Sequence, residues 1–204
     1  MSLPLVSAIG LGALHGVRHV FEPDHLATVS AIATDGRGTR TAMYLGAIWG
    51  VGHLVALLTM CGAAMAAGAA IPAAVMVVVD LAIGGVLVAL GANAIRAPRA
   101  AGARAFGGTR RSLCVGLLHG LAGSGALTAL VIAELPGMAA RVAFVVLFGA
   151  ASILGMAALS GAIGAPLART ARRPRVAKAL RVAAGASAIA VGITVVAGVV
   201  GGAP

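Results

Sequence analysis

The sequence predicts an all-α integral membrane protein, and three observations favour that fold class. Of the 204 residues, 60% are hydrophobic and only 10% are charged, whereas a soluble domain carries about 25% charged residues. The mean hydropathy is +1.06. Apolar runs recur along the whole chain, and several are long enough for a membrane-spanning helix, which needs about 20 residues. We therefore expect a single transmembrane domain over residues 1–204, embedded in a lipid bilayer.

Six transmembrane helices are predicted from these apolar runs. They cover about 3–33, 42–67, 72–95, 112–133, 138–165 and 180–202. Pro72 and Pro136 mark two of the boundaries between these spans. Proline lacks a backbone donor and interrupts helices. The first run, at about 31 residues, is longer than one span needs. Since Pro23 lies inside it, we expect this helix to be broken near Pro23, with Asp24 as the N-cap of its second part.

The basic residues gather in three of the connections between these spans. They are Arg37 and Arg40, then Arg96, Arg99, Arg104, Arg110 and Arg111, then Arg169, Arg172, Arg173, Arg175, Lys178 and Arg181. Cytoplasmic loops of membrane proteins carry an excess of Lys and Arg, so we place these connections in the cytoplasm and both termini outside a cytoplasmic (inner) membrane. No recognition motif or aromatic interleaving accompanies the net charge of +10, which disfavours nucleic acid as a partner.

A short internal repeat divides the predicted spans into two halves. The segment Gly12–Gly16 (GALHG) recurs as Gly116–Gly120 (GLLHG). Three spans per half is an odd number, so the halves insert with opposite orientation, as in many secondary transporters with a site at the repeat interface. The expected half-repeats are about 1–95 and 112–204, joined by the basic cytoplasmic loop 96–111. Small-residue pairs of this spacing allow close helix approach, and the sharpest in this chain are Gly12 with Gly16, Gly46 with Gly50, and Gly116 with Gly120.

The five histidines all lie within or beside the apolar runs, at His15, His19, His25, His53 and His119. Ionisable side chains are costly inside a membrane and usually mark a pathway or a site. From the rise per helical residue, His15 and His53 lie roughly 18 Å and 16 Å deep and His119 roughly 10 Å from the cytoplasmic side, so three spans place imidazoles at compatible depths. Imidazole together with the nearby carboxylate of Asp24 is typical of a site for a borderline transition metal.

Some of these ionisable residues also have a purely structural interpretation. Arg18 and Glu22 are four residues apart and can neutralise each other on one helix face. His119 and His53 can be hydrogen-bonded packing residues. Asp80 is either an acid of an outer vestibule or an interface residue. The group of His19, Asp24 and His25 favours function most clearly, because three ionisable side chains within seven residues of a span are hard to explain by structure alone.

Residues 18–26 (RHVFEPDHL) resemble the signature of the nickel/cobalt transporter (NiCoT) family, His-x4-Asp-His within a membrane helix. His19, Asp24 and His25 match that signature, and Gly52-His53 resembles the family's next motif. The resemblance implies that these histidines and Asp24 handle the metal. The chain departs from the family in having Glu22-Pro23 in place of the commoner Asp-Ala, and in having room for six spans where typical members have eight.

A second segment, residues 119–124 (HGLAGS), resembles the small urease-accessory-type nickel permeases, which are distant relatives of the NiCoT family. The later motifs of typical NiCoT members, including an acidic one in the second half, are not recognisable in this chain. The choice of nickel or cobalt is implied by these resemblances. Spacing alone does not select the metal, because imidazole nitrogen suits Ni, Co, Cu and Zn.

The sequence therefore predicts a permease that takes up divalent transition-metal ions, Ni²⁺ or Co²⁺ by resemblance. The predicted metal ligands are His15, His19, Asp24, His25, His53 and His119, and the predicted accessory residues are Arg18, Glu22, Asp80 and Ser124. The ion is cargo, and no resident cofactor is expected.

Three alternatives stay open at this level. They are an anion exporter anchored by Arg18 with histidines as proton carriers, a metal exporter, and a membrane-embedded metalloenzyme. We expect no enzyme, because the sequence has neither a phosphate-binding Gly-x4-Gly-Lys-Ser/Thr loop nor a His-Glu-x-x-His motif. A cytoplasmic metal-acceptor protein is a partner consistent with uptake, and the sequence does not define the oligomeric state.

Overall fold

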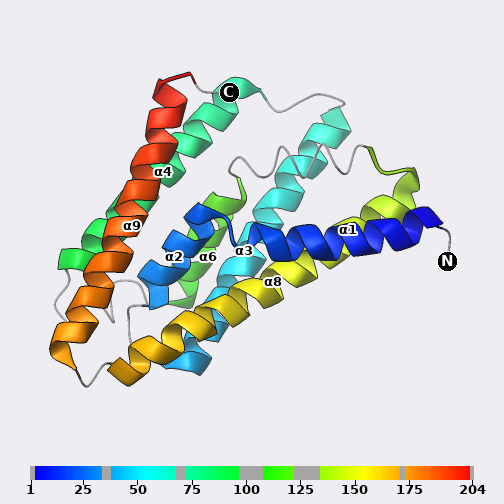
Figure 1. Cartoon of the computed structure of the whole chain (residues 1–204). Helices are drawn as coiled ribbons and strands as arrows, with labels where there is room; N and C mark the ends of the chain where they lie inside the picture. Colours follow the sequence, from blue (N-terminus) through cyan, green and yellow to red (C-terminus); the bar gives the residue numbers. More distant parts are fainter. Residues whose placement is uncertain are drawn as a thin grey trace.

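The protein is all-helical over the part of the chain that the structure, a computed structural model, describes. That part comprises residues 3–33, 38–67, 72–96, 108–121, 134–170 and 173–202. Its helices are α1 (Leu3–His19), α2 (Pro23–Ala33), α3 (Thr39–Ala67), α4 (Ala73–Arg96), α6 (Thr109–Gly120), α8 (Gly137–Thr170) and α9 (Pro174–Val200) (Figure 1). The predicted all-α class is confirmed.

Four of these helices are long and apolar enough to cross a membrane. The spans are Thr39–Met60, Ala73–Arg96, Gly137–Pro166 and Pro174–Val200. Large apolar side chains are exposed on their outer faces, among them Val78, Leu154 and Ile193. Exposed apolar surface of this kind is typical of contact with a membrane, so the chain is a membrane protein. The predicted span over 112–133 is described only as far as Leu121.

The first predicted span consists of two helices, because α1 ends at His19 and α2 begins at Pro23. The break lies where it was expected, but the predicted N-cap is wrong. The carbonyl oxygen of Glu22 accepts the first α2 hydrogen bond, from the backbone N–H of Leu26 at 3.0 Å, so Glu22 is the N-cap. Proline suits the next position, where its missing donor costs nothing. Asp24 instead lies in the first turn, where an acidic side chain suits the helix dipole.

The short helix α6 packs closely on α3 through two glycines. A Cβ atom added to Gly116 would overlap the carbonyl oxygen of Trp49, and one added to Gly120 would overlap that of His53. Neither backbone can retreat without moving a helix, so only glycine permits this approach. The contact places the C-terminal end of α6 directly beside the middle of α3.

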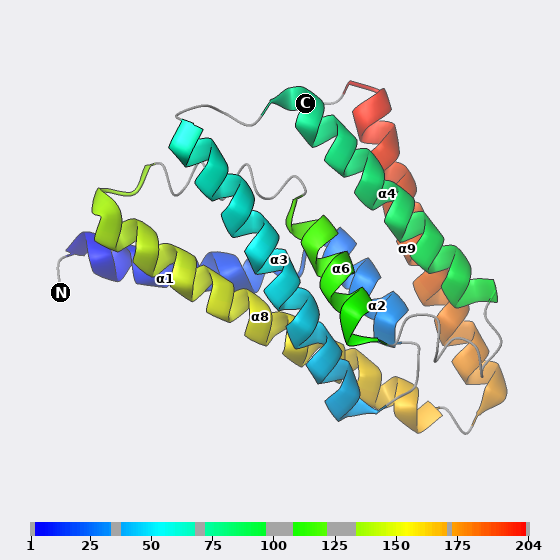
Figure 2. The same cartoon turned by 180° about the vertical axis from the view of Figure 1, so that it is seen from behind.

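Helix α1 packs on α8 by the same means. A Cβ atom added to Gly12 would lie against the backbone of Phe144, and one added to Gly16 against the backbone of Phe148. Both α1 and α8 lie side by side in both views of the molecule (Figures 1 and 2). The close approaches predicted for the glycine pairs of α1 and α6 are therefore confirmed.

Glycines also mediate the contacts between the long helices. They are Gly46 and Gly50 of α3 against α8, and, between α4 and α9, Gly84 with Gly192 and Gly91 with Gly185. The helices α4 and α9 form a pair at one edge of the molecule, with α2 between this pair and α8 (Figure 2). The ends of α3, α4, α6, α8 and α9 that flank the basic connections point toward the lower part of Figure 1.

Candidate metal centre

Three histidines from three helices form a buried cluster beside the break between α1 and α2. His19 is the last residue of α1, His25 lies in the first turn of α2, and His53 lies near the middle of α3. Their side chains are 4%, 1% and 1% exposed. One ring nitrogen of each lies within 4.8 Å of the others, and the Nε2 atoms of His19 and His53 are 2.7 Å apart. Nitrogen atoms at such separations can share one ion, since metal–imidazole bonds are about 2.0–2.1 Å long.

The helix break is what brings His19 and His25 together. In a continuous helix, side chains at this spacing would point in directions about 120° apart. The non-helical residues 20–22 turn the chain, so that the two ring centroids lie 4.3 Å apart. α3 supplies His53, whose ring lies 4.6 Å from that of His19 and 5.1 Å from that of His25. A local interruption of the helix and one long-range contact thus assemble the cluster.

Two carboxylates hold the outer sides of the imidazoles. Nδ1 of His19 lies 3.1 Å from a carboxylate oxygen of Glu22, and Nδ1 of His25 lies 3.0 Å from one of Asp24. In the described part of the chain, Nε2 of His25 and Nδ1 of His53 are buried without a hydrogen-bond partner. A buried unsatisfied polar atom costs about 1–3 kcal/mol. A histidine that is fixed by a carboxylate on one nitrogen and open on the other, as His25 is, is typical of metal ligands.

His119 lies next to the cluster and is held by neighbours of its own. Its side chain is fully buried. Nδ1 donates to the carbonyl oxygen of Val115 at 3.3 Å, and the hydroxyl group of Thr28 donates to Nε2 at 3.1 Å. A carboxylate oxygen of Asp24 lies 4.0 Å from the same Nε2 atom, and the ring lies 5.6 Å from that of His25. His119 thus connects α6 to the first turns of α2.

The structure does not bring His15 into this cluster. His15 lies one turn before His19 on α1, half-buried, with its ring 6.2 Å from that of Phe144. It belongs to neither of the two groups of side chains that could hold a metal ion among the described residues. The sequence predicts His15 and His19 on one helix face. Only His19, the last residue of α1, lies next to α2 and α3.

The predicted accessory residues occupy different places. Glu22 lies beside the cluster, and its ion pairs in the described part of the chain are with His19 and His25. The predicted pairing of Glu22 with Arg18 is not among these, and Arg18 is exposed. Asp80 is half-buried on α4, apart from both groups of metal-binding side chains. Ser124 lies outside the described residues.

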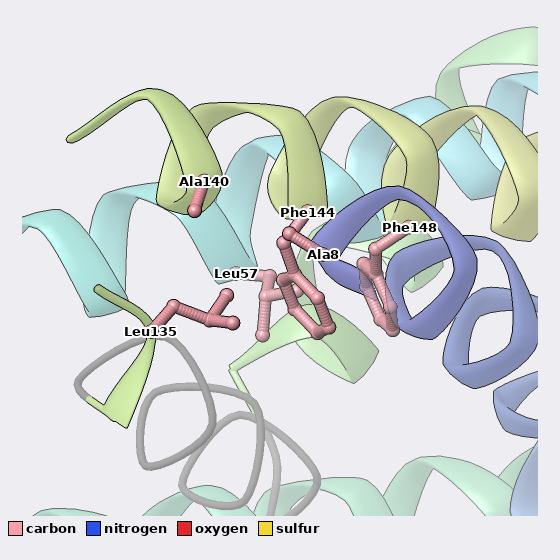
Figure 3. Close-up of a cluster of buried hydrophobic side chains, with 6 residues drawn as sticks. All are labelled: Ala8, Leu57, Leu135, Ala140, Phe144 and Phe148. Atoms are coloured by element: carbon pink, nitrogen blue, oxygen red, sulfur yellow. The ribbon is translucent and has the colours of Figure 1, made fainter. Parts of the chain in front are cut away.

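Two groups of buried apolar side chains reach the histidines. One group consists of Ala8, Leu57, Leu135, Ala140, Phe144 and Phe148 (Figure 3), and the other of Val20, Val29, Trp49 and Met156. The ring of Phe148 lies 5.5 Å from that of His19. The ring of Trp49 lies 5.2 Å from that of His25. A dry surrounding of this kind strengthens electrostatic interactions at the cluster.

Sequence reasoning missed Thr28, which contacts His119, and Trp49, whose ring lies 5.2 Å from that of His25. Both stand at helical spacing from residues that were predicted. Thr28 lies four residues after Asp24, and Trp49 lies four residues before His53, so each shares a helix face with a predicted ligand. That spacing was the available signal. The long-range contacts to His119, at 3.1 Å from Thr28 and 5.7 Å from the Trp49 ring, could not be read from it.

The chain is similar to a protein named urease accessory protein UreH from Bacillus sp. (strain TB-90). The two are 27% identical over 188 residues, which cover 84% of this chain and 82% of that protein. A similarity of this extent reaches far beyond the His-x4-Asp-His segment. No family model matches the chain, and no solved structure matches it.

Proposed function

We propose that the protein is a secondary transporter that takes up Ni²⁺, with Co²⁺ as the nearest competing ion, across the cytoplasmic membrane. The observation that carries this proposal is the buried cluster of His19, His25 and His53, in which one ring nitrogen of each lies within 4.8 Å of the others. His25 and His53 each also have one buried nitrogen without a partner in the described structure. Nitrogen donors of this kind suit the later divalent transition metals. Asp24 lies beside the cluster, with one carboxylate oxygen 3.0 Å from Nδ1 of His25.

The charge of the cargo provides a driving force. A divalent cation gains about 4.6 kcal/mol per 100 mV on crossing inward, twice the value for a single charge. The three imidazoles of the cluster are neutral ligands, so they compensate none of the charge of the ion. A site of this kind binds an ion firmly enough to select it, yet leaves release feasible. Uptake along the membrane potential therefore needs no hydrolysis of a nucleotide by this chain.

The same proposal includes six spans in two inverted halves, about 1–95 and 112–204, joined by loop 96–111, with both termini outside. Two observations support it. The recurring glycine segments of α1 and α6 each lie on a long helix of the other half, α1 on α8 and α6 on α3. The helix ends that flank the basic connections point to one side of the molecule (Figure 1), as cytoplasmic loops require.

The choice of nickel rests on two similarities. Residues 18–26 resemble the NiCoT signature, and residues 119–124 resemble the urease-accessory-type nickel permeases. A relative whose name is urease accessory protein agrees with the second resemblance. Anion export is not favoured, because its proposed anchor, Arg18, is exposed. A cytoplasmic metal-acceptor protein on the basic side remains part of the proposal.

The test is accumulation of ⁶³Ni in cells that express the parent chain or its variants. We expect His19→Ala and Asp24→Ala to lower uptake to background while the variants reach the membrane in parental amounts. Glu134→Gln is the matched control, because Glu134 is an exposed carboxylate outside both groups of side chains that could hold an ion, and it should transport like the parent. Accumulation by His19→Ala equal to that of the parent would contradict the proposed site. Competition by Co²⁺, Zn²⁺ and Mn²⁺ in the same assay measures selectivity.

A further inference from the structure

The carboxylates at the helix break form a second group of metal-binding side chains beside the imidazole cluster. Glu22, Asp24 and His25 offer ligand atoms within 4.8 Å of one another. The side chains of Glu22 and Asp24 are 39% and 21% exposed, whereas that of His25 is 1% exposed. This group therefore extends from the surface of the described structure to the buried cluster, and it shares His25 with the group of His19 and His53.

We propose that Glu22, Asp24 and Nδ1 of His25 form a separate outer position, which binds a partly hydrated divalent cation before the ion moves to the imidazole cluster. This inference rests on the proposed transport function. The outer position is not made of acids alone, because its third member is a buried histidine whose opposite nitrogen, Nε2, has no partner among the described residues. Exposed carboxylates at the depth of a span line a water-filled cavity rather than lipid.

The two positions differ in the chemistry of their donors. Carboxylate oxygen suits hard, strongly hydrated ions such as Mg²⁺ and Mn²⁺, whereas imidazole nitrogen suits Ni²⁺ and Co²⁺. Two carboxylates also balance the charge of an arriving dication while it keeps part of its water. At the inner position three buried imidazoles replace that water. The outer position therefore attracts divalent cations with little discrimination, and the inner position selects among them.

His25 makes the two positions mutually exclusive. Its Nδ1 atom lies 3.0 Å from Asp24 and 3.9 Å from Glu22, while Nε2 is the open, buried nitrogen. A neutral imidazole has a single lone pair for a metal, because its other nitrogen carries the proton. An ion in the outer position uses Nδ1, with the proton on Nε2. An ion in the inner position uses Nε2, with the proton on Nδ1, and this N–H donates a hydrogen bond to Asp24. Water carried by the ion takes the proton from Nε2, and water beside the exposed carboxylates supplies one to Nδ1, so the net protonation does not change.

The experiment measures binding of two probe ions, Mn²⁺ by electron paramagnetic resonance and Co²⁺ by visible absorption, to the purified full-length protein. Glu22→Gln is the main variant, because it removes the negative charge but keeps a carbonyl oxygen near Nδ1 of His19. We expect this variant to lower Mn²⁺ affinity at least about tenfold, which is the loss typical when a group around a metal is removed. Its Co²⁺ affinity should stay within about threefold of the parent. His53→Ala should lower Co²⁺ affinity at least about tenfold and leave Mn²⁺ affinity within about threefold. Glu134→Gln should change neither affinity.

The outcomes separate this inference from the proposed function. An equal loss of Mn²⁺ and Co²⁺ affinity in Glu22→Gln would overturn the outer position and leave the transport site standing. Unchanged Co²⁺ affinity in His53→Ala would instead remove the imidazole cluster on which transport depends. A titration of the parent protein needs no variant: Co²⁺ should displace all bound Mn²⁺. Simultaneous binding of both ions with unchanged affinities would disprove a shared His25.

Discussion

Helices α3 and α8 each receive a glycine pair from a shorter helix, yet they present different side chains at the contact. Where α6 lies on α3, the long helix carries Trp49 and His53. Where α1 lies on α8, it carries Phe144 and Phe148. The spacing and the mode of packing are the same in both places. The difference shows that one packing scheme serves twice, once to hold an imidazole of the histidine cluster and once to build a buried apolar group (Figure 3).

The histidines of the two recurring glycine segments differ in the same way. His119 is fully buried and hydrogen-bonded, with its ring 5.7 Å from that of Trp49. His15 is half-buried, with its ring 6.2 Å from that of Phe144. Each histidine thus lies near an aromatic residue of the opposite long helix, but only His119 contacts residues of α2 beside the histidine cluster. The role of a motif residue is decided by what the opposite helix carries.

The largest effect on metal affinity is expected from His53→Phe, which gives α3 a phenylalanine at the position that corresponds to Phe148 of α8. The substitution removes one of three nitrogen donors and places a second phenylalanine beside His19. We expect Co²⁺ or Ni²⁺ affinity to fall at least about 100-fold, beyond the 10–100-fold typical of residues outside the ligand set. Isothermal titration of the purified protein measures this change. Parental affinity in His53→Phe would mean that α3 contributes no ligand.

A Cβ atom at the α6–α3 contact should weaken the fold as well as the site. Gly116→Ala forces the methyl group into the carbonyl oxygen of Trp49, and overpacking of this kind costs about 1–3 kcal/mol. Unfolding in mixed detergent micelles measures the change in free energy. Gly85→Ala is the matched control, because a Cβ atom there meets nothing within 4 Å, so helix propensity should stabilise it by up to about 1 kcal/mol. Equal stability of the two variants would contradict the close approach.

The sequence predicts the helices of this fold better than it predicts their contacts. Hydropathy and proline positions place the breaks, and the described helices α3, α4 and α8 begin and end within a few residues of expectation. α9 begins earlier, at Pro174, because its basic first turns are too polar to register as an apolar run. The N-cap at Glu22 was missed for a local reason: proline settles the first helical position and so moves the cap one residue before it.

The candidate site shows a similar division. The cluster residues of α1 and α2 are recognisable because polar side chains inside an apolar run stand out. Periodicity alone treated His15 and His19 alike, since it reports a helix face and not where the helix ends. The long-range neighbours of His119 depend on how α6 approaches α3, which no local pattern contains. The spacing of Gly116 and Gly120 predicts that another helix packs closely on α6, but it does not identify that helix as α3.

A smaller effect should separate the two motif histidines. His119→Ala removes the hydrogen bond from Thr28 and a neighbour of Asp24, and we expect metal affinity to fall about tenfold, as for other residues that orient ligands. His15→Ala should stay within about threefold of the parent. Both variants lose one imidazole from an equivalent motif position, so each is the control for the other. Equal losses would show that His15 shares the site after all.

The smallest effect on metal binding is expected on α8. Phe148→Leu keeps an apolar side chain beside His19 but removes the ring that stacks on Phe144, whose centroid lies 6.1 Å away. The smaller side chain leaves a cavity, which should lower the free energy of unfolding by about 1 kcal/mol, while metal affinity stays within about threefold because no donor is lost. A tenfold loss of affinity at parental stability would mean that the α8 aromatic pair acts on the ion directly, and the contrast between α3 and α8 would then not hold.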